Sequence, residues 1–265
     1  MNVFLEPNCD EKLKGLELHI EAVMSGKKLV IPDFSAREVL VLDLKLHPPK
    51  KGLSFKDGQA RLLHDLASIE LQAMELALRT LTEYEGLNPQ FQEEMIQLIK
   101  SEASHFSLCL RTLRDWGFNW GDWPVHLALW NAVSKEDTLE ERIFIVHRYL
   151  EGSGLDAADT ILRRLKGLEV PTQAMEVLTI ITAEEIGHVQ FGSHWFHEFC
   201  RQKKLDSDQE FRSILQRKRH SLPKRVEPIN FELRKKALFN DFEIQELNQL
   251  RESFLSKDKS YVRGC

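Results

Sequence analysis

The feature that most constrains the fold is a Glu-x-x-His motif that occurs twice, each time inside a long helical pattern. The first copy is Glu102-Ala-Ser-His105 and the second is Glu185-Ile-Gly-His188. On an α-helix, residues three apart lie on one face about one turn apart, so the Glu and His of one copy could bind a metal ion together. A single copy occurs on many surface helices by chance, and the repetition makes the pattern informative.

Each motif is preceded by a further Glu at a similar distance along the chain. Glu70 lies 32 residues before Glu102, and Glu151 lies 34 residues before Glu185. The order Glu, Glu-x-x-His, Glu, Glu-x-x-His is that of the ligands in ferritin-like four-helix bundles that hold two metal ions. We therefore predict an all-α fold, a ferritin-like four-helix bundle with a long crossover between its second and third helices.

The first Glu of this series lies within the apolar stripe of the first predicted helix. Glu70 is flanked by Leu66 and Ala73 at helical spacing. A buried carboxylate is strongly unfavourable unless it meets a metal ion, a cation or a proton. Glu75 has leucines at the same spacing in a narrower stripe, so we prefer Glu70 and keep Glu75 as the alternative ligand.

The other three helices carry recognisable start or stop signals. Asn88-Pro89 is an N-cap followed by proline at the first helical position, and Gly117 is a natural end for that helix. Its apolar stripe includes both residues of the first motif. Thr138-Leu-Glu-Glu141 is a capping box for the third helix, and Pro171 is expected to open the fourth.

Three further residues are candidates to support the ligands through hydrogen bonds: His147, Asp156 and Glu184. His147 lies one turn before Glu151, where it could bind that carboxylate, although a core or surface histidine is an equal alternative. Glu184 is adjacent to the second motif but does not have the spacing to pair with its His.

Two glycines directly follow the third-helix Glu. Gly152 and Gly154 each cost about 0.5–1 kcal/mol relative to alanine inside a helix. Their presence predicts a local bulge or a close helix approach near the metals, with tight packing alone as the alternative.

The chain divides into three predicted segments. Residues 1–55 form an N-terminal arm that packs on the bundle, residues 56–200 form the bundle, and residues 201–265 form a basic helical C-terminal extension. Prolines break the apolar runs of the arm, so we expect it to be extended with one short helix. The aromatic crossover between Trp116 and Trp130 is expected to be core, or alternatively to line a substrate entrance.

Composition excludes several classes of protein. No stretch approaches the roughly 20 apolar residues needed to span a bilayer, and the N-terminus lacks a basic region followed by an apolar one, so we expect a cytoplasmic protein with no membrane contact. The cysteines form no Cys-x-x-Cys pair, which argues against a zinc ribbon and a disulfide framework. The net charge of −5 gives no general attraction for nucleic acid, but basic runs in the last quarter leave an RNA contact there open.

Longer stretches resemble a known family. The segments His64–Ala77, Leu150–Asp156 and Glu184–Val189 are similar to an uncharacterised bacterial family of the ferritin-like superfamily, catalogued as domain of unknown function 455. A proline-rich leader and a tail like Pro228–Ala237 extend the resemblance over most of the chain. It implies that the metal ligands are Glu70, Glu102, His105, Glu151, Glu185 and His188. Gly152-Ser153 departs from the expected Ala-Arg, which puts any role of that arginine in doubt. A more distant likeness is to tRNA hydroxylases that act on an isopentenylated adenosine.

Four carboxylates and two imidazoles suit iron or manganese better than structural zinc. The leading hypothesis is a protein with two iron ions, or with manganese or a mixed pair, that activates dioxygen to hydroxylate or otherwise oxidise an unidentified small molecule or modified nucleoside. The alternatives are iron binding or ferroxidase activity without an organic substrate, and an RNA- or protein-binding module on the same fold. A homodimer remains open.

Overall fold

The computed structural model describes residues 1–168 and 172–262, and for residues 257–262 it describes the backbone alone. Within these ranges the regular structure is helical, apart from an isolated bridge between Val41 and Val125. The described part of the chain is therefore all-α, as predicted, and the ferritin-like arrangement stays a prediction.

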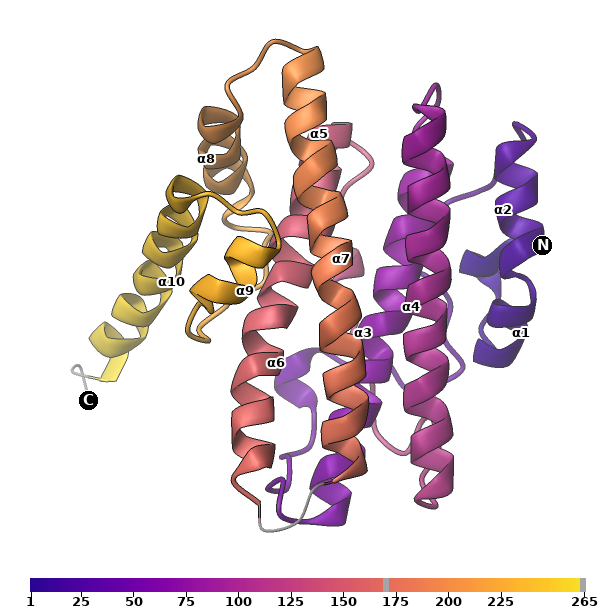
Figure 1. Cartoon of the computed structure of the whole chain (residues 1–265). Coiled ribbons are helices and arrows are strands. Elements are labelled where there is room, and N and C mark those ends of the chain that lie inside the picture. The colour runs from indigo at the N-terminus through magenta and orange to yellow at the C-terminus, as the bar shows by residue number, and fades with distance from the viewer. Residues whose placement is uncertain (169–171, 263–265) are drawn as a thin grey trace. The chain divides into compact units, whose positions relative to one another are not determined.

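The chain divides into two compact units, whose helices are labelled in Figure 1. The first unit comprises Met1–Asn131 with Leu168–Val177, and the second comprises Ala132–Gly167 with Leu178–Cys265. Buried apolar side chains occur in both units.

The first unit is organised around two long helices, α3 (Lys56–Glu83) and α4 (Pro89–Asp115), which lie side by side in an antiparallel hairpin (Figure 1). Every residue of α3 from Leu71 to Leu81 is buried, so this half of the helix is covered on all sides. Ile69 is exposed, although it lies three residues after Leu66, which belongs to the apolar stripe predicted for this helix. The stripe assigned it to the wrong face because apolar residues occur almost all round this helix.

The signals at both ends of α4 are confirmed. The Asn88 side chain accepts hydrogen bonds from the N–H groups of Gln90 and Phe91, and Pro89 is the first helical residue. After the helix ends, Gly117 takes a φ of 81°, a left-handed conformation that favours glycine. These local signals fix the ends of the helix that carries the first motif.

The N-terminal arm contains more helix than the sequence predicted. It forms α1 (Cys9–Lys14) and α2 (Leu16–Met24), besides the 3-10 turns η1 (Val3–Leu5) and η2 (Leu44–Leu46). The expectation of one short helix was wrong because Asn8 caps α1 through its side chain and a second helix follows at once. Further along, the arm bonds to the crossover, where Val125 exchanges hydrogen bonds with Leu40 and Leu42.

The second unit begins with a continuous helical stretch in three parts. The α5 helix (Leu139–Ile143) starts at the predicted capping box, in which Thr138 and Glu141 bond to each other's backbone N–H groups. It leads into a π-helical segment, η4 (Phe144–Leu150), and then into α6 (Glu151–Lys166). The predicted opening of the next helix at Pro171 lies outside the described residues, and the helix itself, α7, runs over Gln173–Gln202.

Three more helices complete the second unit: α8 (Ser207–Lys218), α9 (Phe231–Lys236) and α10 (Asp241–Val262). An ion pair buried from solvent joins α10 to η4, because both terminal nitrogens of Arg148 donate to Glu243 at 2.8 and 2.7 Å. The Arg148 guanidinium also lies over three phenylalanine rings, those of Phe196, Phe211 and Phe239. The last part of the chain is thus anchored to the π-helical segment.

The structure bears on two conclusions drawn from composition, one on membrane-spanning segments and one on the cysteines. None of the described helices is both long enough and apolar enough to cross a membrane. Cys9, Cys109 and Cys200 are buried free thiols, and Cys265 lies outside the described residues.

Candidate metal centre

The first unit brings together three of the predicted ligands. The Nδ1 atom of His105 lies 3.3 Å from Oε2 of Glu70 and 3.6 Å from Oε2 of Glu102. All three residues are buried. Glu102 and His105 are one turn apart on the buried stripe of α4, and Glu70 faces them from α3. Two helices therefore direct two carboxylates and one imidazole at a common point.

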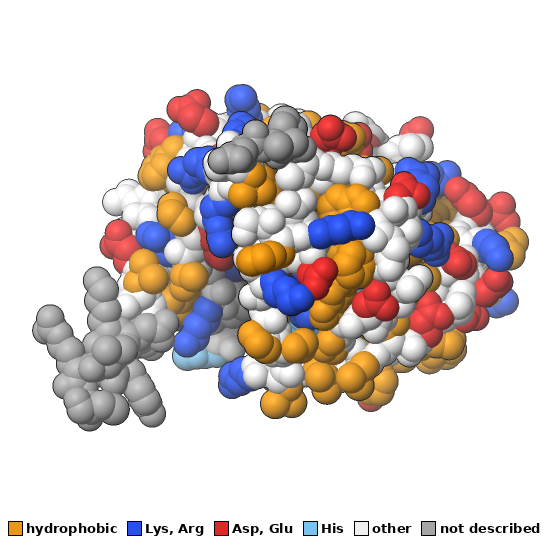
Figure 2. Space-filling model, turned by 90° about the horizontal axis from the view of Figure 1, so that it is seen from below, with side chains coloured by type: hydrophobic (Ala, Val, Ile, Leu, Met, Phe, Trp, Pro, Cys, Tyr) orange, Lys and Arg blue, Asp and Glu red, His pale blue; other side chains and the backbone are white. Residues whose placement is uncertain are grey.

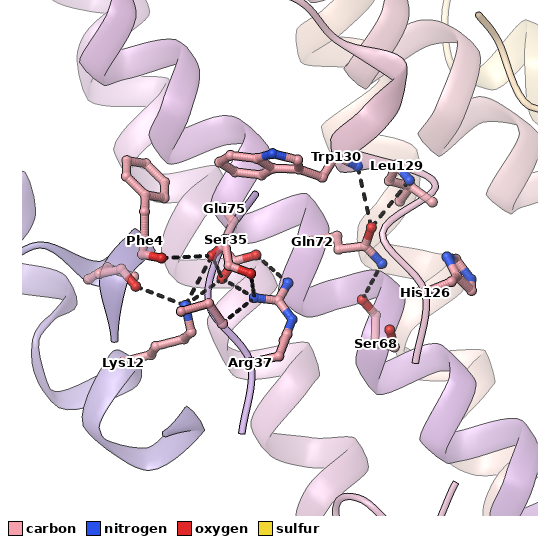
Figure 3. Close-up of polar contacts among 12 residues, drawn as sticks. Phe4, Lys12, Ser35, Arg37, Ser68, Gln72, Glu75, His126, Leu129 and Trp130 are labelled. Atoms are coloured by element: carbon pink, nitrogen blue, oxygen red, sulfur yellow. Dashed lines mark hydrogen bonds and ion pairs between the residues drawn. The ribbon is translucent and has the colours of Figure 1, made fainter. Parts of the chain in front are cut away.

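The alternative ligand on α3, Glu75, is engaged by the N-terminal arm (Figure 3). Its Oε1 atom accepts hydrogen bonds from Lys12 Nζ at 2.8 Å, Arg37 Nη1 at 2.8 Å and Ser35 Oγ at 2.6 Å. Burial alone would raise the pKa of Glu75, but the charges of Arg37 and Lys12 outweigh it and hold the pKa below its usual value. Glu75 therefore has two cations already, and Glu70 is the α3 carboxylate that meets the motif.

A buried glutamine fixes the crossover against α3 between these two carboxylates (Figure 3). Gln72 Oε1 accepts from the N–H groups of Leu129 and Trp130, and its Nε2 atom donates to the carbonyl of Ser68. Trp130 is itself buried, and its indole N–H donates to the Asp33 carbonyl. This end of the aromatic crossover is core, and it holds α3 in one rotational position.

The second unit holds the other three predicted ligands. Glu185 and His188 are one turn apart on α7, with His188 Nδ1 3.0 Å from Glu185 Oε1. On the third helix, His147 Nδ1 lies 2.8 Å from Glu151 Oε1. The other nitrogen of His147, Nε2, is buried and has no hydrogen-bond partner among the described residues. The contact expected between His147 and Glu151 is therefore present.

The backbone before Glu151 is widened by the π-helical segment. The N–H of Glu151 donates to the carbonyl of Val146, five residues back instead of the usual four. Such segments occur often at functional sites because the extra residue changes the direction of the side chains that follow. The bulge that the glycines suggested therefore lies directly before Glu151.

Close approaches accompany the bulge. A Cβ atom added at Gly192 of α7 would lie 2.5 Å from Cβ of His147, so glycine lets α7 pack directly on the π-helical segment. A Cβ atom at Gly152 would lie 2.1 Å from Nη1 of Arg234, and the same Nη1 donates to the carbonyl of Arg148. The guanidinium beside Gly152 therefore belongs to Arg234 of α9. The position after Gly152, where the family resemblance led us to expect an arginine, is a serine.

The two remaining candidates to support the ligands are Asp156 and Glu184. Asp156 is buried, but its carboxylate accepts from Arg234 and from the N–H of Asn230, so it anchors α9. Glu184 is exposed on α7. No signal in a single sequence links Asp156 to Arg234, which is 78 residues further along the chain.

The donor atoms fit the metals that the sequence suggested. The Glu and His residues that could hold a metal ion include Glu102 and His105 in the first unit and Glu185 and His188 in the second. Burial, helped by the charge of Glu70, raises the pKa of the neighbouring Cys109 thiol well above its usual value. A set of carboxylates and imidazoles without thiolate suits iron or manganese.

Several basic residues of the C-terminal extension are paired within the second unit. Arg217 binds Glu141 and Glu210, and Lys218 binds Asp137. Acidic and basic side chains are also intermixed on the face of the molecule that Figure 2 shows. Part of the basic character read from the sequence is therefore neutralised locally.

The comparisons with known proteins give one relative and one family. A protein of Haemophilus influenzae, named "Uncharacterized protein", is 32% identical over 223 residues, which cover 81% of this chain and 75% of that protein. No solved structure matches the chain. A family model described as "Protein of unknown function (DUF455)" matches residues 5–245, and this confirms the predicted family. The chain therefore belongs to the DUF455 family.

Proposed function

We propose that this protein is a dinuclear metal oxidoreductase with a ferritin-like four-helix bundle, formed by α3, α4, the α5–α6 stretch and α7. Each unit contributes a Glu and a Glu-x-x-His motif, and the two sets together hold two iron ions, for which manganese could substitute. The proposed ligands are Glu70, Glu102, His105, Glu151, Glu185 and His188.

The observation that carries the proposal is the position of His105 between two buried carboxylates, those of Glu70 and Glu102. Carboxylates held together in a protein interior repel one another unless cations neutralise them. Four ligand carboxylates balance the charge of two divalent ions, so a dinuclear centre accounts for the whole set.

The residues around Glu151 position its carboxylate. His147 binds one carboxylate oxygen through Nδ1, which restricts the carboxylate to one orientation. The direct packing of Gly192 on His147 fixes the imidazole in turn. The π-helical segment sets the direction in which the Glu151 side chain points.

Two ferrous ions held by these residues would supply the chemistry to activate dioxygen for the oxidation of a C–H bond. The chain's own contribution is to hold the donors in place and keep water from them, since Glu70, Glu102 and His105 are all buried. A modified nucleoside is the first substrate class to screen, because of the likeness to tRNA hydroxylases.

Dioxygen consumption tests the proposal, with adjacent glutamates of α7 as a matched pair. Protein loaded anaerobically with ferrous iron is exposed to dioxygen with and without fractionated cell extract or tRNA. We expect extract-dependent consumption in the wild type and in Glu184→Gln, and its loss in Glu185→Gln. Consumption that stops once the iron is oxidised, whatever is added, would favour ferroxidase activity, and a cage-sized particle on size exclusion would favour storage. No consumption at all contradicts an oxidoreductase.

A further inference from the structure

A recess in the second unit gathers arginines away from the proposed metal ligands. It lies between α6, the segment that joins α8 to α9, and α10, and it has an empty volume of about 300 Å³ including its mouth. Arg225, Arg234 and Arg251 line it, together with two carboxylates, Asp156 and Glu227. The charged side chains therefore leave an excess of one positive charge.

The three arginines differ in how many of their N–H groups are hydrogen-bonded within the protein. Arg234 directs Nε and Nη2 at Asp156 and Nη1 at a backbone carbonyl, so its donors are committed. Arg251 donates through Nε to the carbonyl of Val226. Arg225 makes no hydrogen bond or ion pair with any residue that the structure describes, and its Nε atom is buried.

Folded proteins usually supply hydrogen-bond acceptors to a guanidinium that is removed from water, and Arg225 lacks them among the described residues. Removing a guanidinium from water is costly unless hydrogen-bond acceptors replace the water. Burial lowers the pKa of Arg225, and the charge of Glu227 offsets this only in part. A bound oxyanion would supply the acceptors, because phosphate and carboxylate match the fork of N–H groups on a guanidinium.

The rest of the recess indicates what kind of molecule would carry the anion. Leu247, Leu250 and Phe254 of α10 add apolar side chains to the lining, which also includes Ser153 and Asp156 of α6. Because the 300 Å³ includes open solvent at the mouth, the enclosed part of the recess is smaller than a typical ligand pocket, so it suits a single anionic group and excludes a whole nucleotide.

We propose that Arg225, assisted by Arg251, binds a phosphate or carboxylate group of a small ligand in this recess. The site is independent of the proposed metal centre. Tyr149 and Ser153, which line the recess, are each two residues from Glu151, and residues two apart on a helix point to nearly opposite sides. Anion binding and metal binding can therefore be tested separately.

Thermal unfolding of the full-length chain tests the site. Inorganic phosphate and acetate are titrated separately, with sodium chloride keeping the ionic strength constant so that general screening does not change. At least one anion should raise Tm in a saturable way, and the difference between them identifies the preferred group. Arg225→Gln should weaken the affinity by about tenfold or more, because a charge-assisted hydrogen bond is lost.

Arg201→Gln is the matched control, since Arg201 is an exposed arginine of the same unit, paired with Glu198. It should keep the wild-type response. No saturable rise with either anion, or an equal rise in Arg225→Gln, would overturn the proposal.

A second measurement covers the case in which Arg225→Gln does not fold. Wild-type protein is treated with phenylglyoxal, which modifies arginines, and the modified peptides are mapped by mass spectrometry. The anion that raises Tm should protect Arg225 and leave Arg201 unprotected. Equal modification of Arg225 with and without the anion would contradict the site.

Discussion

His105 places its Nδ1 atom 3.3 Å from Oε2 of Glu70, so the Glu-x-x-His motif of α4 faces a carboxylate from α3. This contact lies within one unit, and it distinguishes between the two candidate glutamates of α3. Glu70 meets the motif, whereas Glu75, five residues later, is bound by Lys12 and Arg37 of the N-terminal arm. The two carboxylates therefore have different partners and should have different functions.

Substitution of each glutamate by glutamine should separate these functions. Glu70→Gln should fold and lose most of the bound iron, because an amide is a poor ligand. Glu75→Gln leaves Lys12 and Arg37 without their buried counter-charge, so it should cost roughly 3–5 kcal/mol of unfolding free energy while the folded protein still binds iron. Urea unfolding and iron content of the folded fraction measure the two effects. The reverse pattern would make Glu75 the ligand.

The glycines after Glu151 make a second matched pair. Gly152→Ala would bring its new Cβ against Arg234 and displace a guanidinium that binds Asp156, so we expect a loss of about 1–3 kcal/mol. Gly154→Ala meets nothing within 4 Å and should stabilise the helix by about 0.5–1 kcal/mol. Denaturant midpoints of both variants test this. Equal effects would mean that Gly152 is not required for the close approach.

The pairing of Glu243 with Arg148 predicts how stability depends on pH. Burial alone would raise the pKa of Glu243, but a hydrogen bond from His197 and the charge of Arg148 lower it to about 2. The ordinary pKa of glutamate in an unfolded chain is about 4.3, so the folded state favours the ionised form. The resulting stability is complete above about pH 5 and is lost as the pH falls towards 2.

The variant Glu243→Gln should remove this dependence. It should be less stable than the wild type by about 3 kcal/mol at pH 6, and the difference should shrink as the pH approaches 2. Glu11→Gln, which breaks the exposed pair with Lys14, is the control and should leave stability nearly unchanged, because solvent screens that pair. A difference for Glu243→Gln that stays constant between pH 6 and 3 would contradict the lowered pKa.

Features encoded over a few residues could be predicted from the sequence. The cap at Asn88, the capping box at Thr138 and the stop at Gly117 each depend on neighbours within one helical turn, and all three are present. The buried stripe of α4, which includes Glu102 and His105, was also predicted, because polar and apolar residues alternate clearly on that helix.

Features that depend on distant residues could not be predicted. The cations that bind Glu75 come from residues 63 and 38 positions earlier in the chain, and no sequence pattern near Glu75 indicates them. The π-helical segment before Glu151 was suggested only indirectly, through Gly152 and Gly154. Arg234, which contacts this segment, lies on α9, and α7 and α8 come between it and Gly152 in the sequence. Long-range pairing of buried charges leaves no periodic pattern in one sequence.

The most direct test of the central claim is metal content. Protein loaded anaerobically with ferrous iron and freed of excess is analysed for iron per chain, beside Glu102→Ala and Glu185→Ala, which remove one ligand from each unit, and Glu184→Ala as the control. The proposal predicts about two irons per chain in the wild type and the control, and loss of iron in both ligand variants. No tightly bound iron in the wild type, or equal uptake in all four proteins, would contradict a dinuclear centre held by these residues.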